Sequence, residues 1–188
     1  ALVKAGHEVT ALVRNQAGAE RLRDRAARCV TGDLSSWDGI RAHAEEHDAY
    51  VHTAFEWTAR GAELDAASVE ELIALARRAG AQALVYTSGI WVLGQTPGAD
   101  ESAPVNPVPL VAWRPAVEQR VLQAGVEGLR TTVIRPGIVF GGGRGIVSDL
   151  LKDAENGIMR VVGSGENYWP LVYDRDLADL YVRLVSHP

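Results

Sequence analysis

The sequence has few of the residues that would indicate a secreted or nucleic-acid-binding protein. Its 188 residues include one cysteine, Cys29, which cannot form an internal disulfide, so we expect a reduced, cytoplasmic protein that folds by packing alone. Lysine and arginine number 19 against 24 aspartates and glutamates. The resulting charge of -5 supplies no positive field for a phosphate backbone, so nucleic acid is not an expected partner.

Long hydrophobic runs are absent too. No stretch approaches the roughly 18 to 20 apolar residues of a membrane helix, and no basic-then-apolar segment opens the chain, so no membrane partner is expected. The five histidines show no tight spacing with cysteine or paired carboxylates, so no metal site is expected either. The opening residues, ALVKAGHEV, lack an initiator Met and read as the end of a helix, so we take the sequence to be a piece of a longer chain.

The residues that are present alternate between helical and strand patterns. Three times an Ala-Gly pair ends a helical stretch and leads into an apolar strand, so Gly6, Gly80 and Gly125 are expected to stop helices in the left-handed conformation. Apolar strands covered on both faces are typical of a parallel, doubly wound α/β sheet. We expect strands at Val9–Val13, Tyr50–Thr53, Ala83–Thr87 and Thr131–Ile134, and helices at Ala17–Ala27, Trp37–Glu46, Ala62–Ala79 and about Val108–Ala124.

The pattern changes after Phe140. GGGRG is followed by an expected helix at Val147–Glu155, a short strand in MRVVGSG and a closing helix from Asp174, whose first turn Asp174 and Asp176 are expected to cap. We therefore divide the chain into a main α/β part, 1–140, and a second part, 141–188, within one globular unit. The Pro97–Pro109 span holds four of the eight prolines and predicts a surface loop at the ligand-binding edge of the sheet.

Seven motifs follow one another along the chain: VTALVRN, TGDLSS, VHTA, VYTSGIWVLG, RPAVEQRVL, VIRPGIVFGGGRG and VGSGENYWPLVYDRDLADLY. In this order they resemble the extended or atypical short-chain dehydrogenases/reductases, the NAD(P)-dependent epimerase/dehydratase group. The resemblance implies that 1–140 is a nucleotide-binding domain and that 141–188 begins a substrate-binding region. The resemblance implies a Rossmann-type fold whose first strand and Gly-rich turn would lie upstream of Ala1. The cluster Gly141, Gly142, Gly143 and Gly145 lacks the spacing of such a turn, and we interpret it as a flexible loop near the substrate.

The resemblance also implies which residues hold the adenosine half of the cofactor. Arg14 ends a strand where a cation pairs with the 2′-phosphate of NADP, so NADP is the expected cofactor with NAD left open; the alternative is a solvated strand-end arginine. Asp33 and Leu34 correspond to the family's adenine contact, although Asp33 also suits a turn before Ser35. Thr53 and Ala54 correspond to the family's stretch beside the adenine ribose, where small residues allow close approach of the cofactor; the alternative is plain packing at the end of the strand.

At the nicotinamide end the resemblance implies that Thr87, Pro136 and Gly137 contact the cofactor and that Ser88 is a candidate catalytic hydroxyl. The family's hydroxyl nearest the substrate falls, however, at Gly89. The expected Tyr-x-x-x-Lys pair, in which Lys lowers the Tyr pKa, falls on Leu110 and Arg114.

Four residues apart, Leu110 and Arg114 are expected to share a helical face, so that Arg114 can bind the nicotinamide ribose; the alternative is a surface ion pair with Glu118. A leucine carries no proton. Trp113, Tyr86, Tyr168 and the Pro97–Pro109 loop remain open as sources of a replacement donor.

These features favour an NAD(P)-dependent oxidoreductase, epimerase or reductase acting on a small carbonyl or sugar-like substrate. The loss of the tyrosine at Leu110 supports a rival, a non-catalytic NADP(H)-binding sensor or regulatory protein, and a scaffold is the weakest alternative. Neither the substrate nor the oligomeric state is readable from the sequence, and a homodimer stays open. Large aromatic residues pack in the core more often than they line a substrate pocket, so we expect core positions for Trp57, Trp91 and Trp169.

Overall fold

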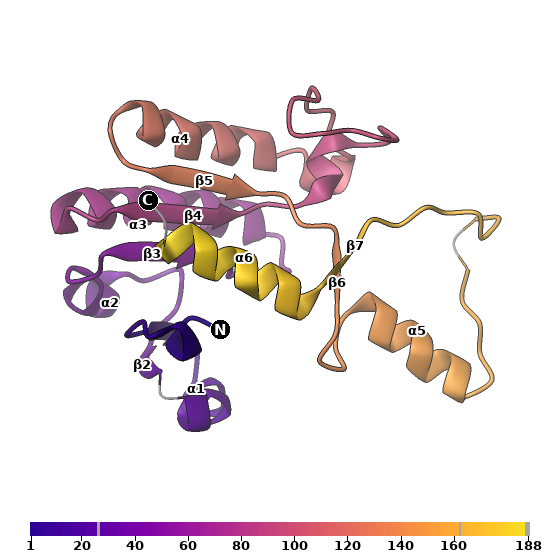
Figure 1. Ribbon diagram of the computed structural model, residues 1–188, viewed down its shortest axis with the longest axis horizontal. Coiled ribbons are helices and arrows are strands. Elements are labelled where there is room, and N and C mark those ends of the chain that lie inside the picture. The colour runs from indigo at the N-terminus through magenta and orange to yellow at the C-terminus, as the bar shows by residue number, and fades with distance from the viewer. Residues whose placement is uncertain (26, 162, 187–188) are drawn as a thin grey trace.

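The computed structural model describes residues 1–25, 27–161 and 163–186. Strands and helices alternate along the chain as far as β5, as the sequence predicts (Figure 1). The elements are β1 (Thr10–Val13), α1 (Gln16–Leu22), β2 (Arg28–Thr31), α2 (Asp38–Ala44), β3 (Ala49–His52), α3 (Gly61–Ala79), β4 (Ala83–Thr87), α4 (Arg114–Val126), β5 (Thr131–Ile134), β6 (Ile138–Phe140), α5 (Ile146–Glu155), β7 (Leu171–Tyr173) and α6 (Asp174–Ser186).

The strands form parallel ladders. β3, β4 and β5 make a three-stranded sheet in that order, with Val51 opposite Val85 and Val85 opposite Thr132. β1 pairs with β2 in a second sheet and β6 with β7 in a third. Because β3, β4 and β5 run in the same direction, their carboxyl ends meet at one edge, which is where ligands of open α/β sheets bind.

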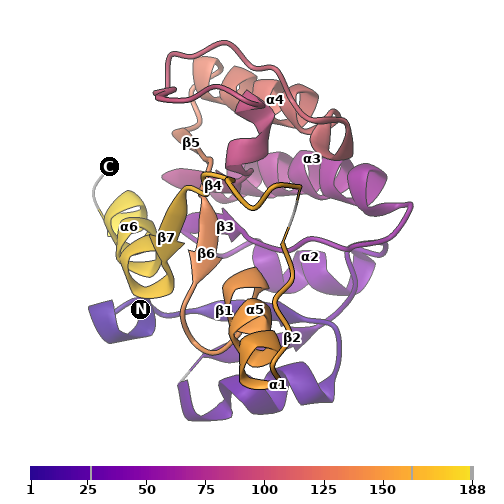
Figure 2. The same cartoon turned by 90° about the vertical axis from the view of Figure 1, so that its right-hand side faces the viewer.

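The core surrounds β4. Leu84, Val85 and Tyr86 are almost completely buried, and Ile73 of α3 and Val121 of α4 pack in the same cluster as Leu84 and Tyr86. Figure 2 shows α2 and α3 on one side of the sheet and α6 on the other. Coverage on both faces explains the continuous apolar run of β4, which the sequence pattern identified correctly.

Glycine positions set several element boundaries. Gly6 and Gly80 take the left-handed conformation directly after helical turns, as predicted. Gly125 instead lies inside α4, and a Cβ there would stand 2.5 Å from the Thr131 hydroxyl, so its role is to let α4 approach β5 closely. The prediction that Gly125 stops the helix was therefore wrong.

Other boundaries also differ from the prediction. The helix expected from Val108 is interrupted, because a short 3-10 helix (Pro109–Val111) precedes α4, which begins at Arg114 with proline in its first turn. The helix expected to reach Ala27 ends at Leu22 and continues as a 3-10 turn, Arg23–Arg25. The strand expected in MRVVGSG does not form in its described residues, 159–161 and 163–165; position 162 lies outside the described residues.

Gly163 and Gly165 have positive φ, which is incompatible with an extended strand, and the strand forms later, as β7. β2, β6 and β7 were not among the expected strands. They are short, and their residues are at most partly buried, so their apolar signal is weak.

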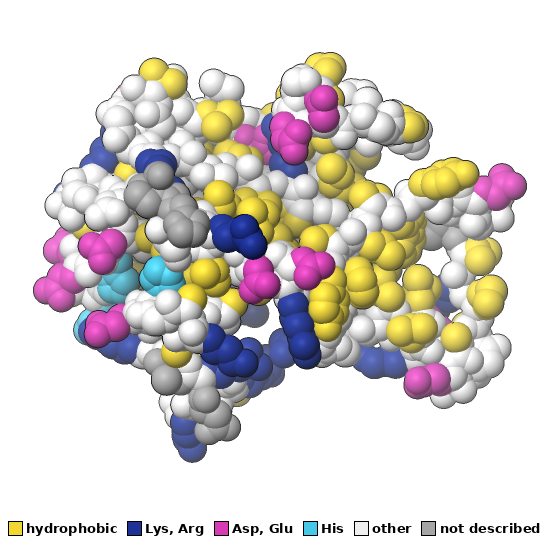
Figure 3. Space-filling model, viewed as in Figure 1, with side chains coloured by type: hydrophobic (Ala, Val, Ile, Leu, Met, Phe, Trp, Pro, Cys, Tyr) yellow, Lys and Arg dark blue, Asp and Glu magenta, His cyan; other side chains and the backbone are white. Residues whose placement is uncertain are grey.

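Residues 138–161 and 163–173 form a small lobe built on the β6–β7 pair and α5 (Figure 1). Hydrophobic side chains gather on the surface over this lobe (Figure 3), and Leu151, Met159, Val161 and Leu171 are exposed. The chain then returns to the main sheet through α6, where the hydroxyls of Tyr181 and Thr87 lie 2.5 Å apart. β6 and β7 thus pair across the boundary drawn at residue 140, and that division stays a prediction.

Within the described residues, none of the helices is long and apolar enough to cross a membrane.

Candidate cofactor and substrate site

Six of the predicted site residues, from both ends of the expected cofactor position, lie at the carboxyl edge of the three-stranded sheet. Thr53 and Ala54 follow β3, Thr87 and Ser88 end β4, and Pro136 and Gly137 follow β5. The edge is fixed by backbone contacts: the Ser88 amide donates to the Ile134 carbonyl and the Ile90 amide to the Pro136 carbonyl. Gly137 is required there, because a Cβ would stand 2.3 Å from the Pro170 carbonyl oxygen.

Ser88 presents an unsatisfied hydroxyl at this edge. The residue is buried, and its Oγ has no hydrogen-bond partner among the described residues. Next to it, Gly89 is extended, and a Cβ built there would meet nothing within 4 Å. Buried polar atoms normally have a partner, so the free Ser88 hydroxyl beside open space suits a ligand that supplies one.

Arg114 is held in place by three contacts. Its Nη1 donates a 3.2 Å hydrogen bond to the Thr87 carbonyl oxygen. Its guanidinium carbon lies 5.2 Å from the Phe55 ring centre and 4.8 Å from the Trp113 ring centre. Cation–π contacts of this kind fix the plane of the guanidinium. The charge of Arg114 is thereby fixed at the end of β4, next to Ser88.

Glu118 pairs with Arg135 instead of Arg114, so the predicted alternative for Arg114 was wrong. Arg135 Nη2 lies 2.6 Å from Glu118 Oε2, and Arg135 Nε donates to both carboxylate oxygens at 3.2 Å. Glu118 is buried. This ion pair ties α4 to the turn that carries Pro136 and Gly137.

Leu110 does not share a helical face with Arg114, which corrects the prediction from the spacing. It lies in the separate 3-10 helix, and 61% of it is exposed. Pro109 begins that turn and Pro115 lies in the first turn of α4, and the chain between them is not continuous α-helix. The position of the family's tyrosine therefore carries an exposed apolar side chain.

A buried polar cluster lies beneath the edge. The Tyr86 hydroxyl donates a 2.6 Å hydrogen bond to Asp65 Oδ2, and His52 Nε2 lies 3.9 Å from Asp65 Oδ1. Burial raises the pKa of Asp65 to about 6 and lowers the pKa of His52 to about 4. Burial also raises the pKa of Tyr86, which is fully buried. Tyr86 is thus sealed from substrate and is excluded as a replacement proton donor.

At the adenosine end, Arg14 follows β1 and is exposed. Asp33 Oδ1 accepts hydrogen bonds from the Ser35 amide (2.9 Å) and hydroxyl (2.6 Å), which is the turn geometry weighed as its alternative. These bonds are the main cause of its lowered pKa, and the charges of Arg14 and Arg60 add to the shift. Arg14 and Arg60 therefore both act on one carboxylate, while the adenine contact of Asp33 stays a prediction.

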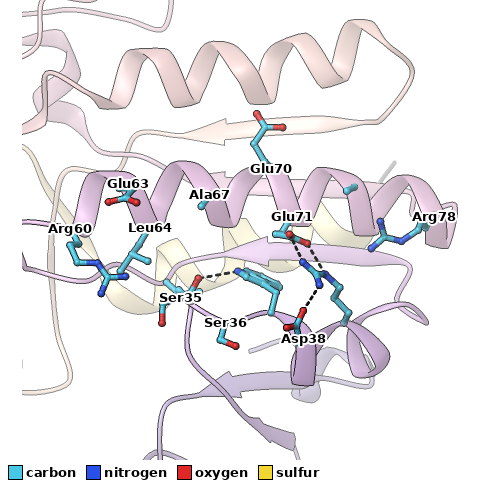
Figure 4. A pocket seen from close by; sticks show the side chains of 14 residues that line it. Ser35, Ser36, Asp38, Arg60, Glu63, Leu64, Ala67, Glu70, Glu71 and Arg78 are labelled. Atoms are coloured by element: carbon cyan, nitrogen blue, oxygen red, sulfur yellow. Dashed lines mark hydrogen bonds and ion pairs between the residues drawn. The ribbon is translucent and has the colours of Figure 1, made fainter.

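Leu34 packs against the core and lines a cavity of about 730 Å³ between the loop after β2 and helix α3. Figure 4 shows Ser35 and Ser36 on one side and Arg60, Leu64 and Ala67 of the α3 segment on the other. Arg41 donates to both Glu71 oxygens and to Asp38 at the far end. The cavity begins next to Asp33, where the adenine is predicted to lie.

The expectation that the tryptophans pack in the core was wrong for two of them. Trp57 is 75% exposed and Trp91 is 40% exposed, whereas Trp169 is partly buried. Trp57 instead makes an edge-on contact with Phe55, at 4.8 Å between ring centres. The sequence offered one overlooked signal, because Phe55 and Trp57 directly follow the strand end at Thr53 and Ala54.

Two predictions for the second part of the chain remain, together with the expectation about metal. Asp174 and Asp176 both lie in the first turn of α6, where acidic residues favour the helix dipole. The four glycines Gly141, Gly142, Gly143 and Gly145 form the loop between β6 and α5, all with positive φ. Within residues 1–25, 27–161 and 163–186 there is no cluster of three potential metal ligands.

The NAD(P)H-binding family model matches residues 1–188, the whole chain. The chain belongs to the NAD(P)H-binding family. Among curated proteins it is 32% identical to the uncharacterised protein C2A9.02 of Schizosaccharomyces pombe, over 96% of this chain and 63% of that protein. It is 30% identical to the 2-alkyl-3-oxoalkanoate reductase of Stenotrophomonas maltophilia, over 88% of this chain and 54% of the reductase.

A third relative is the 4-hydroxy-2-methyl-3-oxo-4-farnesyl-3,4-dihydroquinoline-1-oxide ketoreductase of Stigmatella aurantiaca, 32% identical over 75% of this chain and 46% of the enzyme. The chain thus spans about half to two thirds of the length of these relatives. The fold matches the UDP-glucose 4-epimerase of Thermus thermophilus in complex with NAD, with a TM-score of 0.80, 22% identity and coverage of 97% of this chain and 68% of the epimerase. The predicted Rossmann-type fold is therefore confirmed.

Proposed function

We propose that the protein is an NAD(P)-dependent reductase of a small ketone, with NADP as the preferred cofactor. Two relatives at 30% and 32% identity are named as reductases of oxo compounds, which supports ketone reduction over sugar epimerisation. The observation that carries the proposal is that the unsatisfied Ser88 hydroxyl directly follows β4 and that the Arg114 guanidinium is bound to the carbonyl of the preceding residue, Thr87.

The residues at this edge fit a dinucleotide. Small residues, Thr53 and Ala54, end β3, and open space beside Gly89 leaves room at the end of β4. The exposed Arg14 makes no ion pair within the described residues, so its guanidinium is available to the 2′-phosphate of NADP. When bound, the reduced cofactor supplies a hydride.

The side chains of this chain then act on the ketone oxygen. The Ser88 hydroxyl donates a hydrogen bond to it, and the Arg114 guanidinium stabilises the negative charge that develops there while orienting the nicotinamide ribose. Arg114 stays protonated near neutral pH, so it cannot pass on a proton. Because Leu110 has no proton and Tyr86 is buried, we assign the proton to water.

Substitution of Arg114 tests the proposal. Arg114→Ala should raise the dissociation constant for NADPH and lower kcat/KM by roughly tenfold to a hundredfold, the effect of losing a charge-assisted hydrogen bond. Leu110→Ala should leave both nearly unchanged. Arg120→Ala, which removes a partly exposed arginine of the same helix paired with Glu70, is the control.

NADPH oxidation with a panel of ketones, together with calorimetric titration, measures these effects. Unchanged affinity and turnover in Arg114→Ala would contradict the assigned role. Collapse of turnover in a folded Leu110→Ala variant would contradict the placement of the site along this segment.

A non-catalytic NADP(H) sensor is the second candidate. It is favoured by Gly89 and Leu110, which leave both of the family's substrate hydroxyls unfilled. NADPH binding without turnover of any ketone in the panel would support the sensor and contradict the reductase.

A further inference from the structure

Three aromatic side chains form a continuous wall beside Arg114. This aromatic wall consists of Phe55 and Trp57, from the loop after β3, and Trp113, directly before α4. The Phe55 and Trp113 rings are stacked, 5.5 Å apart with a 7° angle between their planes. The Trp57 ring meets Phe55 edge-on, at 4.8 Å and 84°. The guanidinium of Arg114 packs over Phe55 and Trp113, so the wall is joined to the end of β4 through the bond from Arg114 to Thr87.

Trp57 is the solvent-exposed member of the wall, whereas Phe55 and Trp113 are partly buried and Trp113 packs against the main core. Trp57 is 75% exposed, and Leu110, three residues before Trp113, is 61% exposed. Large rings gain free energy by leaving water, so an indole that stays exposed on a base of partly buried aromatic rings at a ligand-binding edge favours a recognition surface there. The wall also adjoins the Ser88–Arg114 pair that we assign to the ketone oxygen.

The aromatic wall provides few hydrogen-bonding groups for the hydroxyls of a sugar. Sugar recognition needs a hydrogen-bonding group for each of several hydroxyls, because each buried hydroxyl left unpaired costs free energy. Gly89 and Leu110 supply no such group. Of the polar side chains flanking Trp57, the Thr58 hydroxyl already donates its proton to the Glu56 carboxylate at 2.7 Å.

We propose that the substrate is a ketone whose carbonyl is attached to a flat, conjugated or aromatic ring system that lies against Trp57 and Phe55. This inference rests on the reductase function proposed above and names the substrate class of that site. Hydride adds to the carbonyl carbon, the C=O π pair moves to oxygen, and water protonates that oxygen to give a secondary alcohol, while the reduced nicotinamide becomes oxidised. Arg114 and Ser88 hold the oxygen, and the aromatic wall sets the plane of the ring.

Two ketones with equal carbon numbers test this. We expect a higher kcat/KM with NADPH for 2-acetylnaphthalene, which is flat, than for 2-dodecanone, which is flexible. Trp57→Leu, which keeps apolar volume but removes the flat face, should lower kcat/KM for 2-acetylnaphthalene about three- to tenfold, the usual effect of one aromatic contact. The loss should appear in KM, because Trp57 does not touch the reacting carbonyl. Trp57→Phe should restore most of it, and neither variant should change 2-dodecanone turnover by more than about twofold.

The outcomes separate the two proposals. Preference for 2-dodecanone, or equal losses for both ketones in Trp57→Leu, would overturn the aromatic wall as a recognition surface while leaving a ketone reductase. Turnover of UDP-glucose with NADP but of neither ketone would overturn both. Tight NADPH binding with no turnover of any of the three compounds would also overturn both, in favour of the sensor.

Discussion

Asp65 is a buried carboxyl group whose charge opposes folding at neutral pH. Burial raises its pKa from 3.8 to about 6, so the stability linked to its protonated form is fully present below pH 4 and is lost as the pH rises through 6. A shift of about two units corresponds to about 3 kcal/mol at most. Asp65→Asn keeps an acceptor for the Tyr86 hydroxyl without the charge.

We therefore expect Asp65→Asn to unfold with nearly the parent free energy at pH 4 and to be more stable than the parent at pH 8, by up to about 3 kcal/mol. Urea unfolding at both pH values measures the difference. His52, whose pKa is lowered to about 4, contributes stability that is present above pH 6.5 and is lost as the pH falls through 4. The parent and the variant share this contribution, so it cancels in the difference between their free energies of unfolding. A difference that is the same at both pH values would contradict the burial of a raised-pKa carboxyl.

Arg14 decides the choice between NADP and NAD in our account. Arg14→Ala should raise the dissociation constant for NADPH roughly tenfold to a hundredfold and leave that for NADH nearly unchanged, because only NADPH has a phosphate for the guanidinium to bind. Calorimetric titration with both cofactors measures this. The control is Arg21→Ala, which removes an exposed arginine that lies on α1. Equal losses of affinity for NADPH and NADH would contradict this role and favour the alternative, a solvated arginine at the end of the strand.

At the scale of elements, the Glu118–Arg135 pair fixes α4 against the turn after β5. Glu118→Gln should lower the free energy of unfolding by on the order of 3 kcal/mol, because it leaves a partly buried Arg135 without its counter-charge. Adding Arg135→Met should recover more than half of the loss. Glu70→Gln, which breaks the more exposed Glu70–Arg120 pair between α3 and α4, should cost under about 1 kcal/mol. Similar losses in both single variants, measured by urea unfolding, would contradict this role.

The sequence predicted elements well where burial makes a strong pattern. β3, β4, β5 and α3 contain residues of the main core, and their apolar runs located them within a few residues. The sequence prediction failed where tertiary contacts or prolines determine a boundary. Gly125 lies inside α4 because α4 approaches β5 closely there, and two prolines determine where α4 begins. For the candidate site, the motifs indicated Ser88 and Arg114, whose roles stay predictions. The contact of Trp57 with Phe55 depends on side-chain packing that no spacing encodes.

At the scale of the whole molecule, stability is concentrated in the sheet that carries the site. β4 is buried almost completely, whereas β1, β2, β6 and β7 have no buried residue. Backbone amides of β3, β4 and β5 should therefore exchange with solvent more slowly than those of β1–β2 and β6–β7, since local opening is easiest where few apolar contacts are lost. Exchange that is equally slow in β6–β7 would contradict this gradient.

Hydrogen exchange with and without NADPH tests the central claim, that the carboxyl edge of β3, β4 and β5 holds the cofactor. We predict that saturating NADPH slows exchange at residues 53–57, 87–89 and 135–137, the three segments that end these strands, and leaves α5 unchanged as an internal control. Protection confined to the Gly141–Gly145 loop, or none at the three strand ends while calorimetry shows NADPH bound, would contradict the placement of the cofactor at this edge.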